Sequence, residues 1–326
     1  MATRVQRLNL TADRIEAVLR DGRAPARVVG GKVLPSFVEM LLEPQPGTKV
    51  SQIKALLQDI SLAVGHNNVR LSQTGTHLDL QIGKNGARDA VKLTSLLEQC
   101  AGTEGCIAVL GLSEDGAPLM VKISSPEVSH VLISGATGSG KTSLAQSMIL
   151  SLCAHNKPAK LGLIVLDPKQ RDNTEFDERV LRHLLIPVAH STDEVFEALV
   201  TACAIMDMRK ITPYPEPRVV IYADELADLC ATGGAEIQDM LTRIAVRGRE
   251  AGVHLVVCTQ KPSSKAIGSE LKANLPMRLV GKVASVEDAR MAAGRSGSGA
   301  EKLRGSGDFI AVTMDRFIRF QAALPD

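Results

Sequence analysis

Short, nearly continuous hydrophobic runs alternate with helical patterns along the second two-thirds of the chain. Val, Ile and Leu dominate the runs at residues 161–166, 219–223 and 253–258, and another run spans 279–283. Between them, residues 193–208 and 235–250 place apolar side chains at helical spacing. Parallel strands need long crossover connections, so this alternation predicts parallel strands linked by helices from about residue 119 onward. The expected fold class is α/β.

The N-terminal third has a different pattern. Residues 11–20 and 50–64 carry apolar positions at helical spacing, and a short helix is expected over 90–98. Residues 37–42 resemble a strand ended by Pro44, and residues 77–82 alternate as a half-buried strand does. A break near 111–118 separates this α+β part from the rest. The predicted domains are therefore an N-terminal helical extension (1–30), a small α+β domain (31–115) and an α/β domain (116–326).

A phosphate-binding motif follows an apolar run at 130–134. Residues 135–142 read GATGSGKT and fit G-x-x-x-x-G-K-[ST] at every fixed position, and a helix is expected over 143–152. Glycines let backbone N–H groups surround phosphate oxygens, and a helix N-terminus favours negative charge. An ordinary glycine turn before a helix is the alternative. The candidate nucleotide-binding residues are Gly135, Ala136, Thr137, Gly138, Ser139, Gly140, Lys141, Thr142 and Ser143.

The motif also assigns chemistry to two side chains. Lys141 is expected to contact the β- and γ-phosphates, and the Thr142 hydroxyl is expected to bind Mg²⁺. The expected cofactors are therefore ATP and Mg²⁺.

A second acidic motif ends the apolar run at 218–223. Asp224 would hold Mg²⁺ through water, and Glu225 would act as the general base on the attacking water. We expect this strand to lie beside the phosphate loop. Alternatively, the two acids only cap the following helix. The adjacent pair favours ATP hydrolysis over mere nucleotide storage.

Composition limits the class of protein without naming a partner. The chain of 326 residues is 44% hydrophobic and 23% charged, with a formal net charge of +2, which is ordinary for a globular protein. Six cysteines form no C-x-x-C pair, which favours reduced thiols and a cytoplasmic location. No run is long and apolar enough for a membrane span, and no signal peptide opens the chain, so we expect no membrane insertion.

Several motifs together resemble the motor region of FtsK/SpoIIIE-type DNA translocases, which are RecA-like ring ATPases. The resemblance is specific over about residues 130–310 and weaker over 37–123, and residues 1–30 lie outside it. It implies a RecA-like P-loop domain preceded by the family's small domain. The matching stretches are 130–142 (HVLISGATGSGKT), 166–169 (LDPK), 223–229 (ADELADL), 248–255 (GREAGVHL), 259–262 (TQKP), 271–276 (LKANLP) and 305–308 (GSGD).

The resemblance implies further catalytic roles beside Lys141 and Glu225. Gln260 would end a strand beside the phosphate loop and sense the γ-phosphate there. Arg249 matches the arginine finger that reaches the nucleotide of the next subunit. Arg247 is a rival candidate for the finger. Alternatively, Arg249 only satisfies carbonyls at a helix end.

The resemblance also implies contacts with DNA phosphates in a central channel. The matching positions are Lys261, Lys272 and Arg290, with Lys265 nearby, whereas Val286 stands where the family often has a basic residue. Such contacts are independent of sequence and sensitive to salt. Aromatic residues make up 2% of the chain and tryptophan is absent, so base stacking is poorly supplied and duplex DNA is the expected partner.

The expected function is an ATP-driven double-stranded DNA translocase that works as a homo-oligomeric, hexameric ring. The chain is expected to be a single-motor form, with one ATPase domain, no membrane anchor and no winged-helix module. Two alternatives stay open: a related ring ATPase that moves or recruits proteins for secretion, and a P-loop module that uses nucleotide only to assemble a scaffold. The protein that would load or recruit the ring is not indicated by the sequence.

Overall fold

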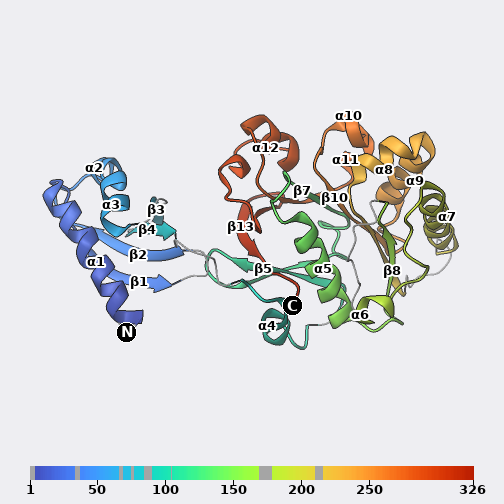
Figure 1. Ribbon diagram of the computed structural model, residues 1–326, viewed down its shortest axis with the longest axis horizontal. Helices are drawn as coiled ribbons and strands as arrows, with labels where there is room; N and C mark the ends of the chain where they lie inside the picture. Colours follow the sequence, from blue (N-terminus) through green and yellow to red (C-terminus); the bar gives the residue numbers. More distant parts are fainter. Residues whose placement is uncertain are drawn as a thin grey trace. The chain divides into compact units, whose positions relative to one another are not determined.

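The computed structural model describes residues 4–33, 37–65, 69–74, 77–83, 90–103, 105–168, 178–209 and 216–326. The chain divides into two compact units, one formed by residues 1–90 with 114–116 and the other by 91–113 with 117–326 (Figure 1). Lys169, in the LDPK stretch, lies outside the described residues.

The smaller unit is an antiparallel sheet with helices packed on it. Its strands lie in the order β1-β2-β4-β3. Ile15, Leu19 and Ile60 from the helices share one buried core with Met40 and Leu80 from the sheet. The elements are α1 (Arg4–Asp21), β1 (Ala26–Val33), β2 (Phe37–Pro44), α2 (Val50–Ala55), α3 (Leu57–Val64), β3 (Val69–Thr74) and β4 (His77–Gly83).

The predicted helix over 50–64 is divided in the structure. Leu56 separates α2 from α3 and has φ −90° and ψ 5°, outside regular helical geometry. Apolar spacing is the same on both sides of this residue, so periodicity alone could not locate the break.

The larger unit is built on one sheet in the order β6-β5-β13-β12-β11-β7-β10-β9-β8. Strands β11, β7, β10, β9 and β8 run parallel to their neighbours in this series. The strands are β5 (Ile107–Ser113), β6 (Pro118–Lys122), β7 (Val131–Ser134), β8 (Leu161–Leu166), β9 (Arg218–Ala223), β10 (Val253–Thr259), β11 (Met277–Val280), β12 (Asp308–Val312) and β13 (Phe317–Ala322).

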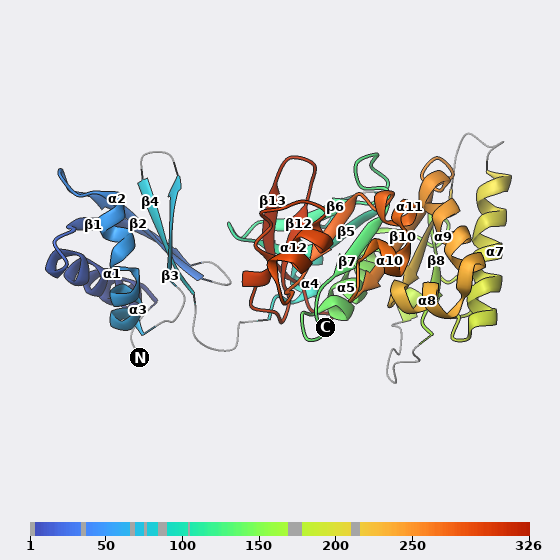
Figure 2. The same ribbon diagram turned by 90° about the horizontal axis from the view of Figure 1, so that it is seen from above.

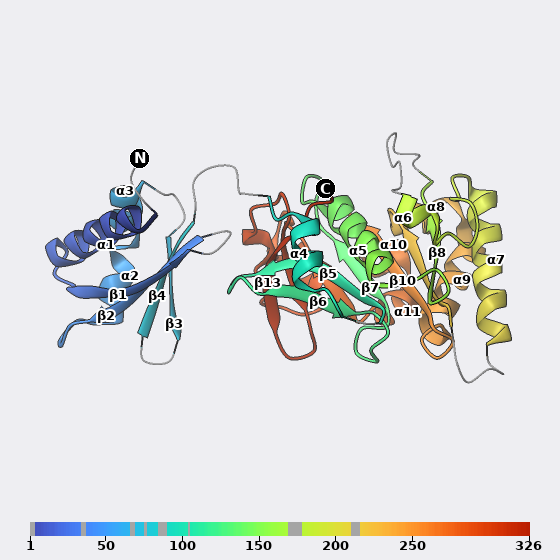
Figure 3. The same ribbon diagram turned by 90° about the horizontal axis from the view of Figure 1, so that it is seen from below.

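Helices cover both faces of the parallel strands. Successive residues of a strand point to opposite faces of the sheet, so each strand packs side chains against both layers of helices. Val220 and Tyr222 pack toward α5 and α6, whereas Val219, Ile221 and Ala223 pack toward α7–α11. Figure 2 shows α7 and α9 beside β8, and Figure 3 shows α4 close to α5. The helices are α4 (Leu93–Gln99), α5 (Lys141–His155), α6 (Glu178–Leu181), α7 (Thr192–Met208), α8 (Leu226–Thr232), α9 (Gly234–Arg247), α10 (Ser264–Ile267), α11 (Ser269–Ala273), α12 (Val286–Ala293) and the 3₁₀ helix η1 (Ala300–Lys302).

The predicted α/β class is confirmed, but the sheet is mixed. Its other half, β6-β5-β13-β12, is antiparallel and pairs with β11 through β12. The backbone N–H of Ser113 donates to the carbonyl of Ala117, and that of Thr313 donates to the carbonyl of Arg316. These short turns leave no room for a crossover helix, so the strands they join must be antiparallel.

The two units do not follow the predicted domain boundaries. Residues 91–113, predicted in the small domain, belong to the larger unit because β5 pairs with β13 and β6. The predicted extension at 1–30 belongs to the smaller unit, where α1 joins the core and β1 pairs with β2.

Candidate functional site: a phosphate loop and its acidic partners

The phosphate loop connects β7 to the N-terminus of α5. Its glycines have φ angles open to few other residues: 156° at Gly135, 78° at Gly138 and 97° at Gly140. A Cβ added at Gly135 would lie 2.8 Å from Ser139 Oγ, and one at Gly140 would lie 2.9 Å from the backbone nitrogen of Gly307. The backbone therefore needs glycine here both for its conformation and for space.

Lys141 is folded into this loop. Its ammonium group donates to the carbonyl oxygens of Gly135 at 2.8 Å and Ala136 at 3.1 Å, and the residue is 9% exposed. The buried hydroxyls of Ser134 and Ser139 have no hydrogen-bond partner among the described residues. A buried cation and unsatisfied donors beside a helix N-terminus fit the phosphate groups of a nucleotide.

The acidic pair follows β9 at the same edge of the sheet. Asp224 is 6% exposed and Glu225 is 5% exposed. The strand does not lie beside the phosphate loop as predicted, because β10 pairs with both β7 and β9 and separates them. The inserted β10 brings its own C-terminal residues, Thr259 and Gln260, between the loop and the acids.

Glu225 is held in a strained conformation. Its φ is +73°, in the left-handed region that costs a non-glycine residue about 1–3 kcal/mol. Its Oε1 atom accepts hydrogen bonds from Thr259 Oγ1 at 2.9 Å and from the backbone N–H of Gln260 at 3.0 Å. The strand end of β10 therefore fixes the direction of this carboxylate.

Gln260 also contacts the phosphate loop. Its side-chain oxygen Oε1 accepts a hydrogen bond from Thr137 Oγ1 at 3.1 Å. Gln260 thus contacts the loop through its side chain and Glu225 through its backbone. Thr259 was not among the predicted site residues, although it belongs to the TQKP stretch.

Several buried groups beneath the loop lie within electrostatic reach of one another. The pKa of the Cys258 thiol is raised by burial and further by Asp224 and Glu225, whereas Lys141 opposes the shift. The pKa of Tyr222 is raised by burial and by the neighbouring Cys258, Asp224 and Asp167. One Asp167 oxygen is buried without a partner among the described residues. Carboxylate and hydroxyl oxygens are the ligands Mg²⁺ prefers, so Asp224 and Thr142 fit this ion.

Arg249 lies at the opposite edge of the sheet. It follows α9 in the turn that leads into β10, and its carbonyl accepts from the N–H of Gly252. The seven residues of β10 then separate it from Gln260, which is a rise of about 20 Å. Its side chain is exposed and forms no ion pair with another described residue. Arg249 is therefore out of reach of the phosphate loop of its own chain.

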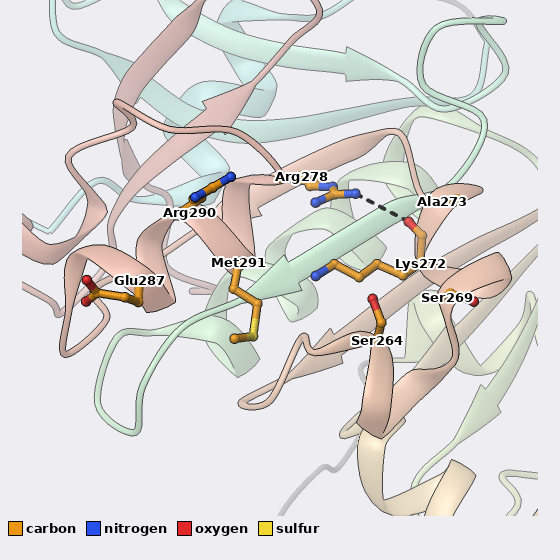
Figure 4. Close-up of a pocket in the computed structure, with 9 residues that line it drawn as sticks. Ser264, Ser269, Lys272, Ala273, Arg278, Glu287, Arg290 and Met291 are labelled. Carbon is orange, nitrogen blue, oxygen red and sulfur yellow. Dashed lines mark hydrogen bonds between the residues drawn. The ribbon is translucent and has the colours of Figure 1, made fainter.

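Two of the four predicted DNA-contact residues, Lys272 and Arg290, are among the residues that line one groove. Lys261 follows Gln260 directly and Lys265 lies in α10, and both are exposed. Figure 4 shows Lys272 of α11 and Arg290 of α12 in this groove together with Arg278 of β11, which sequence reasoning missed. Arg278 lies two positions after the matching LKANLP stretch (271–276). This proximity was the signal in the sequence that could have identified it as a candidate.

A turn at residues 305–308, the GSGD turn, supports the phosphate loop. The backbone N–H of Ser306 donates to the carbonyl of Gly138 at 3.0 Å, and that of Gly307 donates to the carbonyl of Ser139 at 2.8 Å. Asp308 then accepts two hydrogen bonds from the Arg319 guanidinium, at 2.9 and 2.7 Å. The sequence marked this stretch by resemblance, but not its contact with the loop.

This fold and site define the class of protein: a P-loop NTPase fold in which an extra strand, β10, separates the loop strand from the acidic strand. The FtsK/SpoIIIE family model matches residues 103–212 and 210–264, and the FtsK alpha domain model matches residues 2–78. The chain belongs to the FtsK/SpoIIIE family. The second match corrects the expectation that residues 1–30 lie outside the resemblance.

Curated relatives agree with this assignment. The DNA translocase FtsK of Staphylococcus aureus (strain Mu50 / ATCC 700699) is 31% identical over 328 residues, which cover 91% of this chain and 41% of the relative. The DNA translocase FtsK of Mycobacterium leprae (strain TN) is 29% identical over 97% of this chain and 41% of the relative. The chain thus spans about two-fifths of the length of these relatives.

Solved structures show the same fold. The pCW3 conjugation coupling protein TcpA, in monomer form with ATPγS, has a TM-score of 0.64 and 15% identity over 96% of this chain and 95% of that chain. The cytoplasmic domain of the Thermomonospora curvata Type VII secretion ATPase EccC has a TM-score of 0.61 and 23% identity over 72% of this chain and 32% of that chain. Among the described helices, none is both long and apolar enough to cross a membrane.

Proposed function

We propose that this chain is an ATP-driven double-stranded DNA translocase that assembles into a ring of six subunits and hydrolyses ATP at the interfaces between them. Hydrolysis at the interfaces is inferred from the location of Arg249, which lies at the sheet edge opposite the phosphate loop. A catalytic arginine there can act only on the nucleotide of another subunit. Arginine fingers raise the rate of nucleotide hydrolysis by about 10³–10⁵, so the assembled ring would be the active form.

Glu225 is the proposed general base. Among the described residues, both hydrogen bonds to its carboxylate reach Oε1, which leaves Oε2 as the oxygen to accept a proton from the attacking water. Thr259 and Gln260 hold the carboxylate in one orientation, and such positioning is what general-base catalysis requires.

Lys141, Thr142 and Asp224 are the proposed ligands of the nucleotide and its metal ion. Lys141 would exchange its two loop carbonyls for phosphate oxygens, and Thr142 and Asp224 would hold Mg²⁺ directly or through water. The metal ion would supply positive charge against the charge that develops on the phosphate oxygens. Gln260 would transmit a conformational change of the loop to Glu225 through its hydrogen bonds to Thr137 and Glu225.

Duplex DNA is the proposed track, and the cytoplasm is the proposed location. The curated relatives are named DNA translocases, and Lys261, Lys265, Lys272 and Arg290 are the proposed phosphate contacts. The six cysteines are all buried and free, which supports a reducing compartment.

The test is steady-state ATP hydrolysis with and without linear duplex DNA over a salt series, with Glu225→Gln as the blank. A DNA translocase should be stimulated several-fold by DNA, and the stimulation should fade steeply as salt rises. Hydrolysis that is indifferent to DNA at low salt would overturn the proposal. Stimulation by protein instead of DNA would favour a secretion-type ring ATPase.

A further inference from the structure

A tight turn at residues 248–252, the Arg249 turn, joins α9 to β10. The backbone N–H of Gly248 donates to the carbonyl of Ile244 at 2.7 Å, and the N–H of Val253 donates to the carbonyl of Gly248 at 2.8 Å. A Cβ added at Gly248 would collide with the carbonyl oxygens of Ile244 and Val253. The backbone of the turn is therefore compact, whereas the Arg249 side chain that it carries is exposed.

The side chain of Arg209 connects this turn to the segment before β9. Arg209 is the C-cap of α7. Its Nη1 donates to the carbonyl of Ala251 at 3.1 Å, and its Nη2 donates to the carbonyl of Pro217. Ala251 is 6% exposed and belongs to the core that α7 and α9 share with the sheet. One guanidinium thus joins a helix end, a strand start and the Arg249 turn.

The surroundings of Arg209 do not favour its charge. Burial lowers the pKa of Arg209, and the nearby charge of Arg218 lowers it further. The two carbonyl groups that accept its hydrogen bonds offset this effect. A guanidinium presents its donors in a rigid fork, so it can hold two carbonyls at a fixed separation, which a single ammonium group cannot do. The contact therefore depends on the geometry of arginine as well as on its charge.

We propose that Arg209 is a positioning residue for the arginine finger. It would act through Ala251, two positions from Arg249, by fixing the turn so that the finger is directed at the nucleotide of the neighbouring subunit. The inference rests on the proposed function, in which the phosphate loop of one subunit and Arg249 of the next form a shared site. Arg249 forms no ion pair with another described residue, so its direction depends on the backbone that carries it. A misplacement of about 1 Å at a catalytic group can cost about 10²-fold in rate.

The first experiment measures steady-state ATP hydrolysis by the full chain. Arg209→Gln should lower kcat by about 10–100-fold with little change in KM, because the phosphate loop of the variant is intact. Arg209→Lys should be nearly as slow, since an ammonium group cannot hold both carbonyls. The matched control is Arg243→Gln, which removes an arginine contact with Asp207 at the same end of α7 and should retain the wild-type kcat. Equal losses in Arg209→Gln and Arg243→Gln would reduce the effect to a general loosening of α7 and overturn the inference.

The second experiment identifies which side of the shared site is damaged. Arg209→Gln mixed with Lys141→Ala should regain activity beyond either variant alone, since the defect would lie on the finger side. Arg209→Gln mixed with Arg249→Ala should not, because neither subunit then supplies a working finger. In one chain, adding Arg209→Gln to Arg249→Ala should cause no further loss of kcat, since there is no finger left to position. A merely structural role would instead give additive losses, which would overturn the inference.

The reference mixture of Arg249→Ala with Lys141→Ala separates the two proposals. If this mixture regains activity but Arg209→Gln with Lys141→Ala does not, the positioning role is overturned and the shared site stands. If the reference mixture co-assembles by light scattering and regains nothing, the shared site fails and the positioning role fails with it. Thermal unfolding sets an assay temperature at which each variant is folded, and Arg209→Lys replaces Arg209→Gln if the latter does not fold.

Discussion

The Gln260 side-chain oxygen accepts a hydrogen bond from the Thr137 hydroxyl at 3.1 Å, joining the end of β10 to the phosphate loop. The same residue donates its backbone N–H to Glu225 Oε1 at 3.0 Å. A nucleotide that displaces Thr137 would therefore break a hydrogen bond of the residue that orients Glu225, the proposed general base. We therefore expect occupancy of the loop to affect the position of the Glu225 carboxylate.

Removing this connection should slow hydrolysis more than it weakens nucleotide binding. We expect Gln260→Ala to lower kcat by about tenfold or more with a smaller change in KM, because a positioned polar group is lost. Thr137→Val should have a weaker effect in the same direction. The double variant should lose less than the sum of the two, since both changes break one bond. Fully additive effects would show that the bond does not matter.

Glu225→Gln should separate binding from hydrolysis. The amide retains the size of the side chain but cannot accept a proton, so we expect kcat to fall by about 10²–10⁴ while ATP binding stays within a few-fold of wild type. Thr259→Val removes one of the two bonds that hold the carboxylate and should reduce kcat less. Equilibrium nucleotide binding and steady-state rates measure both effects. A Glu225→Gln protein that hydrolyses at the wild-type rate would exclude Glu225 as the base.

Arg249→Ala should abolish ATP hydrolysis, and mixing it with subunits that carry Lys141→Ala should restore part of the activity. Since Arg249 cannot reach its own phosphate loop, Arg249→Ala and Lys141→Ala would damage opposite sides of the proposed shared site. Mixed rings should regain activity beyond either variant alone, because some interfaces again hold both wild-type groups. Arg247→Ala tests the rival candidate, an exposed arginine at the end of the same helix, and should retain activity if Arg249 is the finger. No recovery in mixtures shown to co-assemble would contradict the shared site.

The sequence predicts local chemistry well where residues that act together are close in the chain. The loop at 135–142 and the acids at 224–225 each carry a fixed spacing, and both lie where a strand meets a helix, as that spacing requires. Gln260 was assigned by resemblance, and the structure adds its two contacts. The strand β10 that carries it was expected beside the phosphate loop, where it pairs with β7, but its second pairing with β9 was not expected.

Features that depend on distant pairing were not predictable in the same way. Arg278 and Gly294 are sixteen positions apart, and only the packing of α12 over β11 makes them neighbours. The antiparallel half of the sheet joins β5 to β13, which are about two hundred residues apart in the chain. Hydrophobic alternation identifies a strand but says nothing about its partner. The compact units differ from the predicted domains at residues 91–113 for this reason.

The Asp308–Arg319 pair should matter for nucleotide affinity as well as for stability. Asp308 is buried and also accepts from the N–H of Arg304 at 3.0 Å, so it holds the GSGD turn whose N–H groups bond the loop carbonyls. We expect Asp308→Asn to lower the free energy of unfolding by about 2–4 kcal/mol. The loss is somewhat smaller than for a fully buried pair because Arg319 is partly exposed.

The readout specific to the loop is KM for ATP, measured at a temperature where the Asp308→Asn protein is folded. A several-fold rise in KM is expected, because the turn no longer fixes Gly138 and Ser139. The control is Asp207→Asn, which breaks a comparable Asp–Arg contact with Arg243 on the α7–α9 surface. Equal changes in KM for both variants would reduce the Asp308 effect to general destabilisation.

Two buried histidines at the loop-distal ends of β7 and β10 should make the fold sensitive to acid. Burial lowers the pKa of His130 to about 3. Burial also lowers the pKa of His254 to about 4, although its hydrogen bond to Ser129 acts in the opposite direction. His130 Nδ1 accepts from the N–H of Leu255 at 3.0 Å, so its proton lies on Nε2. Protonating Nδ1 would break this bond. Arg218 faces His254 Nε2 at 3.5 Å, so a charged His254 would meet a second cation.

Because both folded-state pKa values lie below the unfolded value of about 6.5, the unfolded chain binds more protons between those limits. The stability that the neutral imidazoles contribute is complete above about pH 6.5 and is lost as pH falls through about 4. Each histidine should contribute up to about 1.4 kcal/mol of lost stability per pH unit in that window. Urea unfolding between about pH 7 and pH 5 measures the slope, and His254→Asn, whose amide can still donate to the Ser129 carbonyl, should flatten it. An unchanged slope in that variant would show that His254 already carries its proton in the folded chain.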